Sequence, residues 1–104
     1  MSEFEMFLVV AISALRDDAY GVSIRTKMRE QTGRQASIGS IYEALDRMER
    51  AGLLTSRPGE PRPERGGRAR RYFKITAAGA NAYEEKRQTT LSVLRPVVAG
   101  AHVR

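Results

Sequence analysis

Hydrophobic residues recur at intervals of three and four positions between residues 37 and 54, which is the spacing of one face of an α-helix: Ile38, Ile41, Leu45 and Met48. Ser37 is placed to cap the start of this helix, because its hydroxyl can accept a hydrogen bond from a first-turn N–H. Gly52 suits the left-handed residue just beyond the end. The first turn is small and polar, as required of a helix that enters the DNA major groove by its N-terminal end. Taken alone, the same pattern also suits an ordinary core helix.

Two amphipathic segments precede this helix. Residues 3–16 are predicted to form a first helix. Apolar side chains occupy most of its circumference, so we expect other elements to cover it on two sides. A second helix is predicted over residues 22–32, with Val22, Ile24 and Met28 facing inward and a glycine at its end. A short turn then joins this second helix to the helix of residues 37–54, in the order expected of a helix-turn-helix.

A β-hairpin is predicted after Gly52. Residues 53–57 and 71–76 have the composition of strands, and the second segment alternates polar and apolar side chains. Residues 58–70 between them are rich in proline and glycine, which predicts a loop without packed structure. Two strands around such a loop form a wing.

Positive charge is concentrated in this wing. The chain has 104 residues and a formal net charge of +6. Residues 57–74 contain seven cationic side chains and two glutamates, so this segment alone carries a surplus of +5. Charge gathered in one loop is typical of a surface that binds a polyanion, and a solvated loop without a partner is the alternative.

A last helix is predicted from a cap at Thr76 to about Leu94, before Pro96. Its partly apolar stripe comprises Ala80, Tyr83, Arg87, Leu91 and Leu94. Because the winged module is complete before this helix begins, we interpret the stripe as a dimerisation surface, with folding onto the chain's own core as the alternative. The predicted fold is mainly α with a small β-hairpin wing. A winged helix-turn-helix domain covers residues 1–76, and a dimerisation helix and tail cover residues 77–104.

Composition excludes several classes of function. The chain has no cysteine and one histidine, His102 in the predicted tail, so we expect neither a metal site nor a cofactor. The longest apolar run, residues 6–12, is too short to span a bilayer and lacks the flanks of a secretory signal. We therefore expect a cytoplasmic protein without a membrane partner. No nucleophile stands near a histidine and no phosphate-binding glycine loop precedes a helix, so we expect no enzymatic activity.

Three segments resemble the PadR-like transcriptional regulators, a family of bacterial winged-helix repressors. Residues 19–22 resemble that family's tyrosine–glycine turn, residues 37–53 its recognition helix, and residues 67–79 its wing strand and entry to the last helix. The chain departs from the family at Ile38 and Ser40, where proline and threonine are more frequent, and in its long proline-rich wing. The resemblance implies dimers that bind palindromic operators and release them when a small-molecule effector binds. A single C-terminal helix is similar to the smaller of the family's subgroups.

We therefore expect a sequence-specific DNA-binding transcriptional regulator that acts as a homodimeric repressor. Phosphate contacts would set affinity and register, and a few groove-facing side chains would read the sequence. The expected DNA contacts are Ser37, Gly39, Ser40, Tyr42 and Arg47 in the helix and Arg65, Arg68 and Arg70 in the wing. For the tyrosine, a ring packed under the wing is the alternative to a phosphate contact. The alternative function is a winged-helix adaptor whose basic wing binds an acidic protein.

Overall fold

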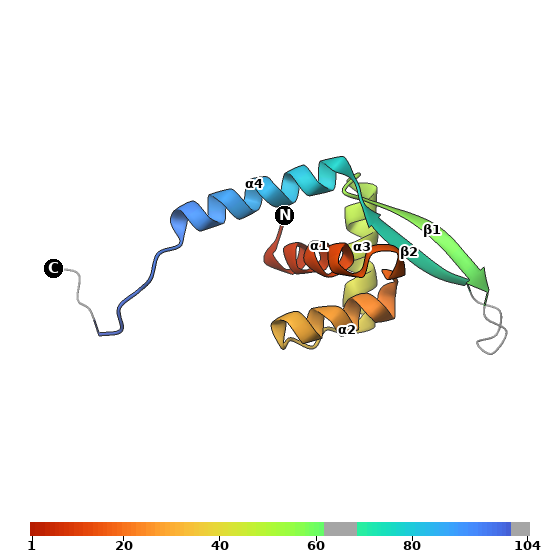
Figure 1. The fold of residues 1–104 in the computed structure, drawn as a ribbon, viewed down its shortest axis with the longest axis horizontal. Helices are drawn as coiled ribbons and strands as arrows, with labels where there is room; N and C mark the ends of the chain where they lie inside the picture. Colours follow the sequence, from red (N-terminus) through yellow and green to blue (C-terminus); the bar gives the residue numbers. More distant parts are fainter. Residues whose placement is uncertain (62–68, 101–104) are drawn as a thin grey trace.

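Four helices and a two-stranded hairpin make up the computed structural model, which describes residues 1–61 and 69–100 (Figure 1). The helices are α1 (Glu3–Leu15), α2 (Gly21–Thr32), α3 (Ile38–Arg50) and α4 (Ala77–Val93), and the strands are β1 (Leu54–Pro61) and β2 (Ala69–Ile75). A 3₁₀ turn over Arg16–Asp18 lies between α1 and α2. The predicted fold class, mainly helical with a β-hairpin wing, is confirmed.

Local capping signals set the ends of the helices. The Ser37 side chain accepts a hydrogen bond from the Ser40 N–H at 3.0 Å, and the Thr76 side chain accepts one from the Gly79 N–H at 3.0 Å. Gly52 lies just beyond α3 with a φ of +79°, in the left-handed region that favours glycine. The predicted helix ends therefore agree closely with the observed ones.

The hydrophobic core lies where α1, α2, α3 and the base of the hairpin meet. Its largest fully buried side chains are Phe73, Leu8, Ile24, Met28, Ile41, Leu45 and Met48. The inward orientation predicted for Val22 is wrong, because this side chain is 42 % exposed. The buried position at the start of α2 belongs to Gly21 instead, where a Cβ would collide with the ring of Tyr42.

The hairpin is longer than the sequence predicted. Pairing runs from Leu54 opposite Ile75 to Pro58 opposite Arg71, and it resumes at Pro61 after an irregularity in the register. The expectation that ordered structure stops after residue 57 is therefore wrong. A two-stranded sheet consists of two edge strands, so a proline can take part where its missing N–H would face away from the partner strand.

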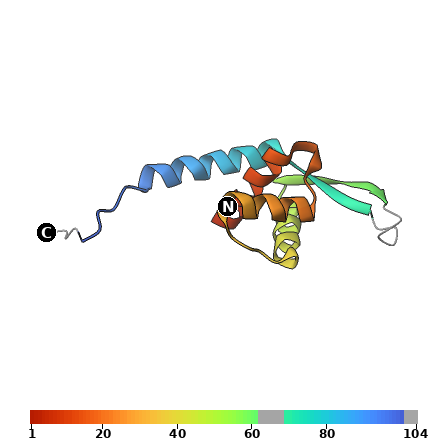
Figure 2. The same ribbon diagram turned by 60° about the horizontal axis from the view of Figure 1, so that its bottom comes forward.

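Helix α4 starts against the winged body and then extends away from it (Figures 1 and 2). At its start, a Cβ on Gly79 would collide with the carbonyl oxygen of Leu53, so the two backbones are in close contact. Tyr83 packs against the core. Farther along, Leu91 and Leu94 are 58 % and 66 % exposed. The first half of α4 therefore folds onto the chain's own core, whereas the second half does not.

Two kinds of feature are missing from the part of the chain that the structure describes. No helix there is long and apolar enough to cross a membrane. The same residues contain no group of three or more histidine, cysteine, aspartate or glutamate side chains placed to hold a metal ion.

Candidate nucleic-acid interface

Helix α3 is held by contacts on three sides. One face carries the core residues named above, and its two flanks are joined by ion pairs to α1 and to the hairpin. The remaining face is exposed and carries Gly39, Glu43 and Arg50. This arrangement leaves one long side of the helix open to a ligand.

The first turn of α3 brings three of the predicted contacts together. Ser37 Oγ donates a hydrogen bond to Ser40 Oγ at 2.9 Å while it caps the helix. Gly39 is exposed, and a Cβ there would meet only Ser37 Oγ, at 4.0 Å. The backbone N–H groups at a helix N-terminus carry partial positive charge. A nucleic acid can therefore approach this turn closely, because no large side chain stands in front of it.

Tyr42 lies against the start of α2. The hydroxyl end of its ring occupies the space where a Cβ on Gly21 would be, and the residue remains 37 % exposed. This position corrects the alternative that the ring packs under the wing. A side chain at position 21 would therefore force the tyrosine ring to move.

Arg47 is held by α1. Its Nε donates a hydrogen bond to Glu5 Oε2 at 3.2 Å, with the side chains 56 % and 13 % exposed. Partial burial alone would raise the pKa of Glu5, but hydrogen bonds from the Ser2 backbone and from Arg47 outweigh it and lower that pKa. Ser2 and Glu5 also cap α1 reciprocally, through bonds of 2.8 and 3.1 Å. The predicted base contact at Arg47 is thus a side chain already positioned by another helix.

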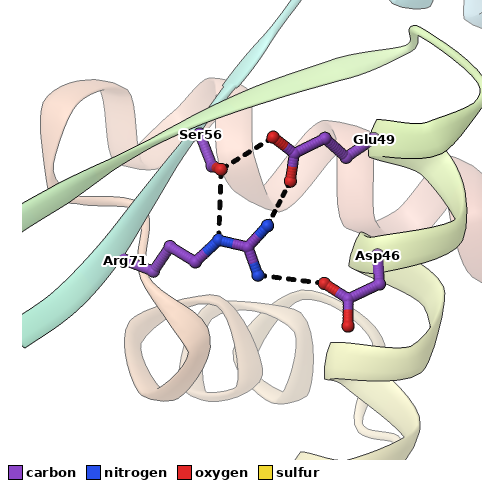
Figure 3. Close-up of polar contacts among 4 residues, drawn as sticks. All are labelled: Asp46, Glu49, Ser56 and Arg71. Carbon is purple, nitrogen blue, oxygen red and sulfur yellow. Dashed lines mark hydrogen bonds and ion pairs between the residues drawn. The ribbon is translucent and has the colours of Figure 1, made fainter.

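Arg71 joins the wing to α3 (Figure 3). Its guanidinium donates to Ser56 Oγ at 3.1 Å, to Asp46 Oδ1 at 3.0 Å and to Glu49 Oε1. Ser56 Oγ in turn donates to Glu49 Oε2 at 2.8 Å. Both strands are therefore tied to the same flank of α3. The sequence counted Arg71 as part of the wing's free charge, and the structure corrects this, because two carboxylates neutralise it.

The other face of the hairpin carries stacked arginines and tyrosines. Tyr20 and Tyr72 form a backbone bridge, and their rings meet edge to face with centroids 5.6 Å apart. The Arg57 guanidinium lies 4.7 Å from the Tyr72 ring centroid, and that of Arg70 lies 4.1 Å from the Tyr20 centroid. Hydrogen bonding to Tyr72 raises the pKa of Arg70 above its ordinary value. The aromatic rings limit where both guanidiniums can point.

A second cationic group lies on α2. Arg25 and Arg29 line an open groove together with Gln35, two residues before the cap of α3. Their four-residue spacing on an exposed face was the available sequence signal, but it is common on solvated helices. Arg65 and Arg68, the other predicted wing contacts, lie outside the described residues.

The residues predicted for dimerisation occupy different environments. Ala80 and Tyr83 line a groove between α4 and α1. Arg87 donates to a glutamate of its own helix at 3.2 Å. Leu91 and Leu94 are exposed beyond this groove. Of the five residues, Tyr83 alone is therefore partly buried by the chain itself.

Comparisons with known proteins agree with this architecture. The model of the transcriptional regulator PadR-like family matches residues 10–85. The transcriptional regulator Rv3488 of Mycobacterium tuberculosis is 37 % identical over 75 residues, which are 72 % of this chain and 66 % of that protein.

Solved structures are similar over most of the chain. A PadR-like transcriptional regulator from Bacillus cereus is 29 % identical, with a TM-score of 0.69 over 86 % of this chain and 82 % of that one. A PadR family transcription regulator from Clostridium difficile is 28 % identical, with a TM-score of 0.65 over 86 % of this chain and 90 % of that one. A transcriptional regulator from Clostridium thermocellum, 23 % identical, has the same fold with a TM-score of 0.71 over 85 % of this chain and 82 % of that one.

Proposed function

This chain belongs to the PadR-like family of DNA-binding transcriptional regulators, and we propose that it is a repressor that binds a palindromic operator as a homodimer. One observation carries the proposal: the first turn of α3 exposes Ser37, Gly39 and Ser40, whereas its one large side chain, Ile38, is half-buried. A turn of this kind can enter a major groove and place its backbone near base edges.

Cationic side chains on the neighbouring elements support the same reading. Arg25 and Arg29 lie on α2 beside the segment that leads into α3, and Arg57 and Arg70 lie on the hairpin. These four arginines suit contacts to phosphates, which supply affinity and register. The exposed face of α3 would then read the bases, because it alone carries side chains that can reach the groove floor.

The proposed dimer is built mainly on α4. Leu91 and Leu94 are exposed, and so is Val93. These hydrophobic residues are clustered at the end of a helix that extends away from the winged domain. Such a cluster favours an interface in which a second protomer covers it. Two-fold symmetry would set the two recognition helices about one DNA turn apart, about 34 Å.

A small-molecule effector, which the family resemblance implies, has a candidate site in the groove between α1 and α4. Phe7, Val10 and Tyr83 supply apolar surface there, and Glu3 and Lys86 supply charge. A ligand in this groove would lie next to the proposed dimer interface, so it would change the spacing of the two recognition helices. Such a ligand should release bound operator DNA.

A gel-shift experiment tests the proposed function. DNA from upstream of the protein's own gene is the probe, and an excess of random duplex is the competitor. We expect a discrete complex that resists the competitor, with two protomers per duplex by analytical ultracentrifugation. Equal competition by random DNA would contradict sequence-specific binding, and one protomer per duplex would contradict the dimer.

A further inference from the structure

Three carboxylates project from the exposed half of α3, and the structure treats them differently. Asp46 and Glu49 are both paired with Arg71, at 3.0 Å for the aspartate and by direct contact for the glutamate. Glu43 is exposed, and within the described residues it has no ion pair or side-chain hydrogen bond. An unpaired carboxylate on a DNA-binding surface repels the phosphates, so its presence on this helix suggests a specific contact that offsets the repulsion.

The neighbours of Glu43 on the helix surface cannot neutralise it. Residues three and four positions away are the ones that a helical side chain meets. On the N-terminal side these are Ser40 and Gly39, and on the C-terminal side they are Asp46 and Arg47. The arginine is the only cation among them, and it is bound to Glu5 of α1. Within the described residues, both carboxylate oxygens of Glu43 therefore remain available to accept hydrogen bonds.

Glu43 occupies the exposed face of α3, close to its N-terminal end. It follows Gly39 by one turn, and a Cβ on Gly39 would meet only Ser37 Oγ, at 4.0 Å. When the N-terminal end of α3 enters a major groove, Glu43 is the first long side chain along this face. Its two oxygens accept hydrogen bonds and donate none.

We propose that Glu43 determines base specificity by accepting a hydrogen bond from the N4 amino group of a cytosine in each operator half-site. This inference rests on the proposed DNA-binding function. In the major groove, cytosine presents only a donor, whereas guanine presents two acceptors and thymine presents an acceptor and a methyl group. Adenine presents a donor beside an acceptor, and that acceptor repels one of the carboxylate oxygens. Cytosine is therefore the best match.

In vitro selection from a random duplex pool tests this assignment on the full-length chain. The variants are Glu43→Gln and Glu43→Ala, with Glu85→Gln on the exposed surface of α4 as the matched control for loss of one negative charge. We expect the wild-type protein to select cytosine at one fixed position of each half-site. Glu43→Gln should shift that position toward adenine, because an amide matches the donor and acceptor of that base. Glu43→Ala should abolish the preference at that position alone, and Glu85→Gln should select the wild-type motif.

Affinity measurements make the test quantitative. Replacing the selected C·G pair by T·A should weaken binding of the wild-type protein about 5- to 150-fold, the range of a good base contact, and should hardly affect Glu43→Ala. A motif that is unchanged in both Glu43 variants would overturn the assignment while leaving sequence-specific binding intact. A pool from which the wild-type protein enriches no motif would overturn the proposed function itself. Thermal melting of each variant verifies folding, which an exposed side chain should not affect.

Discussion

Two arginine side chains connect elements that are far apart in the sequence. Arg71 joins the hairpin to α3, and Arg47 joins α3 to α1. Each pair is partly exposed, so its contribution to the free energy of unfolding is modest. Their larger effect is on position, because together they fix the orientation of α3 relative to the wing and to α1.

Replacing Arg71 by glutamine should weaken binding to operator and random DNA alike. The substitution leaves Asp46 and Glu49 charged beside the bound phosphates. The free energy of unfolding should fall by only about 1 kcal/mol or less, because the pairs are partly exposed. Fluorescence anisotropy with labelled duplexes measures the affinities, and urea titration measures the stability.

A triple variant provides the control for this effect. Adding Asp46→Asn and Glu49→Gln to Arg71→Gln removes the uncompensated charge and should restore part of the affinity. Wild-type affinity in the single variant would contradict a role for Arg71 in DNA binding.

Glu5 makes the stability of the fold depend on pH. Its pKa is lowered in the folded protein, so its ionised form stabilises the fold above the pKa of the unfolded chain. That contribution is lost as the pH falls through the lowered folded pKa. At neutral pH, Glu5→Gln should therefore reduce the free energy of unfolding by about 0.5–1 kcal/mol. The difference from wild type should shrink in acid.

Urea titrations at neutral and acidic pH measure this difference. Glu3→Gln is the matched control, because it removes a carboxylate from the same helical turn while its 3.1 Å pair with Arg34 is more exposed. A destabilisation by Glu5→Gln that is equal at both pH values would show that charge is not the cause.

Positively charged side chains lie on the hairpin and on α2, two elements that pack against α3. Stacking on tyrosine rings holds the guanidiniums of Arg57 and Arg70 on one face of the hairpin. Arg71, although on the same strand, points to the opposite face and serves α3 instead. Strand alternation therefore places Arg70 and Arg71 on opposite faces of the hairpin.

Removing wing cations should weaken binding to all DNA sequences by a similar factor. The variant is Arg65→Ala, Arg68→Ala and Arg70→Ala together. Each phosphate contact that is lost should reduce the slope of log K against log salt concentration by about 0.9. Salt titrations of the wild type and the triple variant measure the slope, and Lys86→Ala on α4 controls for general loss of charge. An unchanged slope would exclude these three residues as phosphate contacts.

At the scale of the whole molecule, α4 extends the chain beyond the winged body (Figure 2). Its first half contacts α1 and the hairpin, and its second half exposes leucines. A single copy presents one recognition helix, whereas a palindrome requires two at a defined separation. In the proposed dimer, the arrangement of α4 would therefore set the separation of the two recognition helices even though α4 is remote from α3.

Leu91→Glu should convert the protein to a monomer. In a two-fold interface the substitution acts twice, and it buries two carboxylates near the axis at a large cost in free energy. Helical content measured by circular dichroism should be retained, tight operator binding should be lost, and weak binding to random DNA should persist. Sedimentation velocity at micromolar concentration measures the assembly state.

A conservative variant separates charge from shape at this position. Leu91→Met should remain dimeric, because it keeps the volume and apolar character of the side chain. A wild-type protein that is monomeric at micromolar concentration and still binds operator tightly would contradict the dimer model.

The sequence by itself determined where each helix begins and ends and which face of α3 is buried. Ser37, Thr76 and Gly52 act on the backbone within a few residues of themselves, so their effects can be read without the rest of the chain. The apolar period of α3 was equally informative, because burial of one helix face needs only some neighbouring surface. The exposed polar first turn followed from the same reading.

The tertiary structure alone decided which partner each polar side chain meets. Arg47 and Glu5 are 42 positions apart, and Arg71 and Asp46 are 25 apart, so no local pattern relates them. Gly21 is buried against Tyr42 of α3, whereas Val22, the next residue, is exposed. Such contacts depend on the angles and distances at which elements pack, and these follow from the shapes of many side chains at once. Periodicity reports that a residue is exposed, whereas packing decides whether its charge is neutralised or available to DNA.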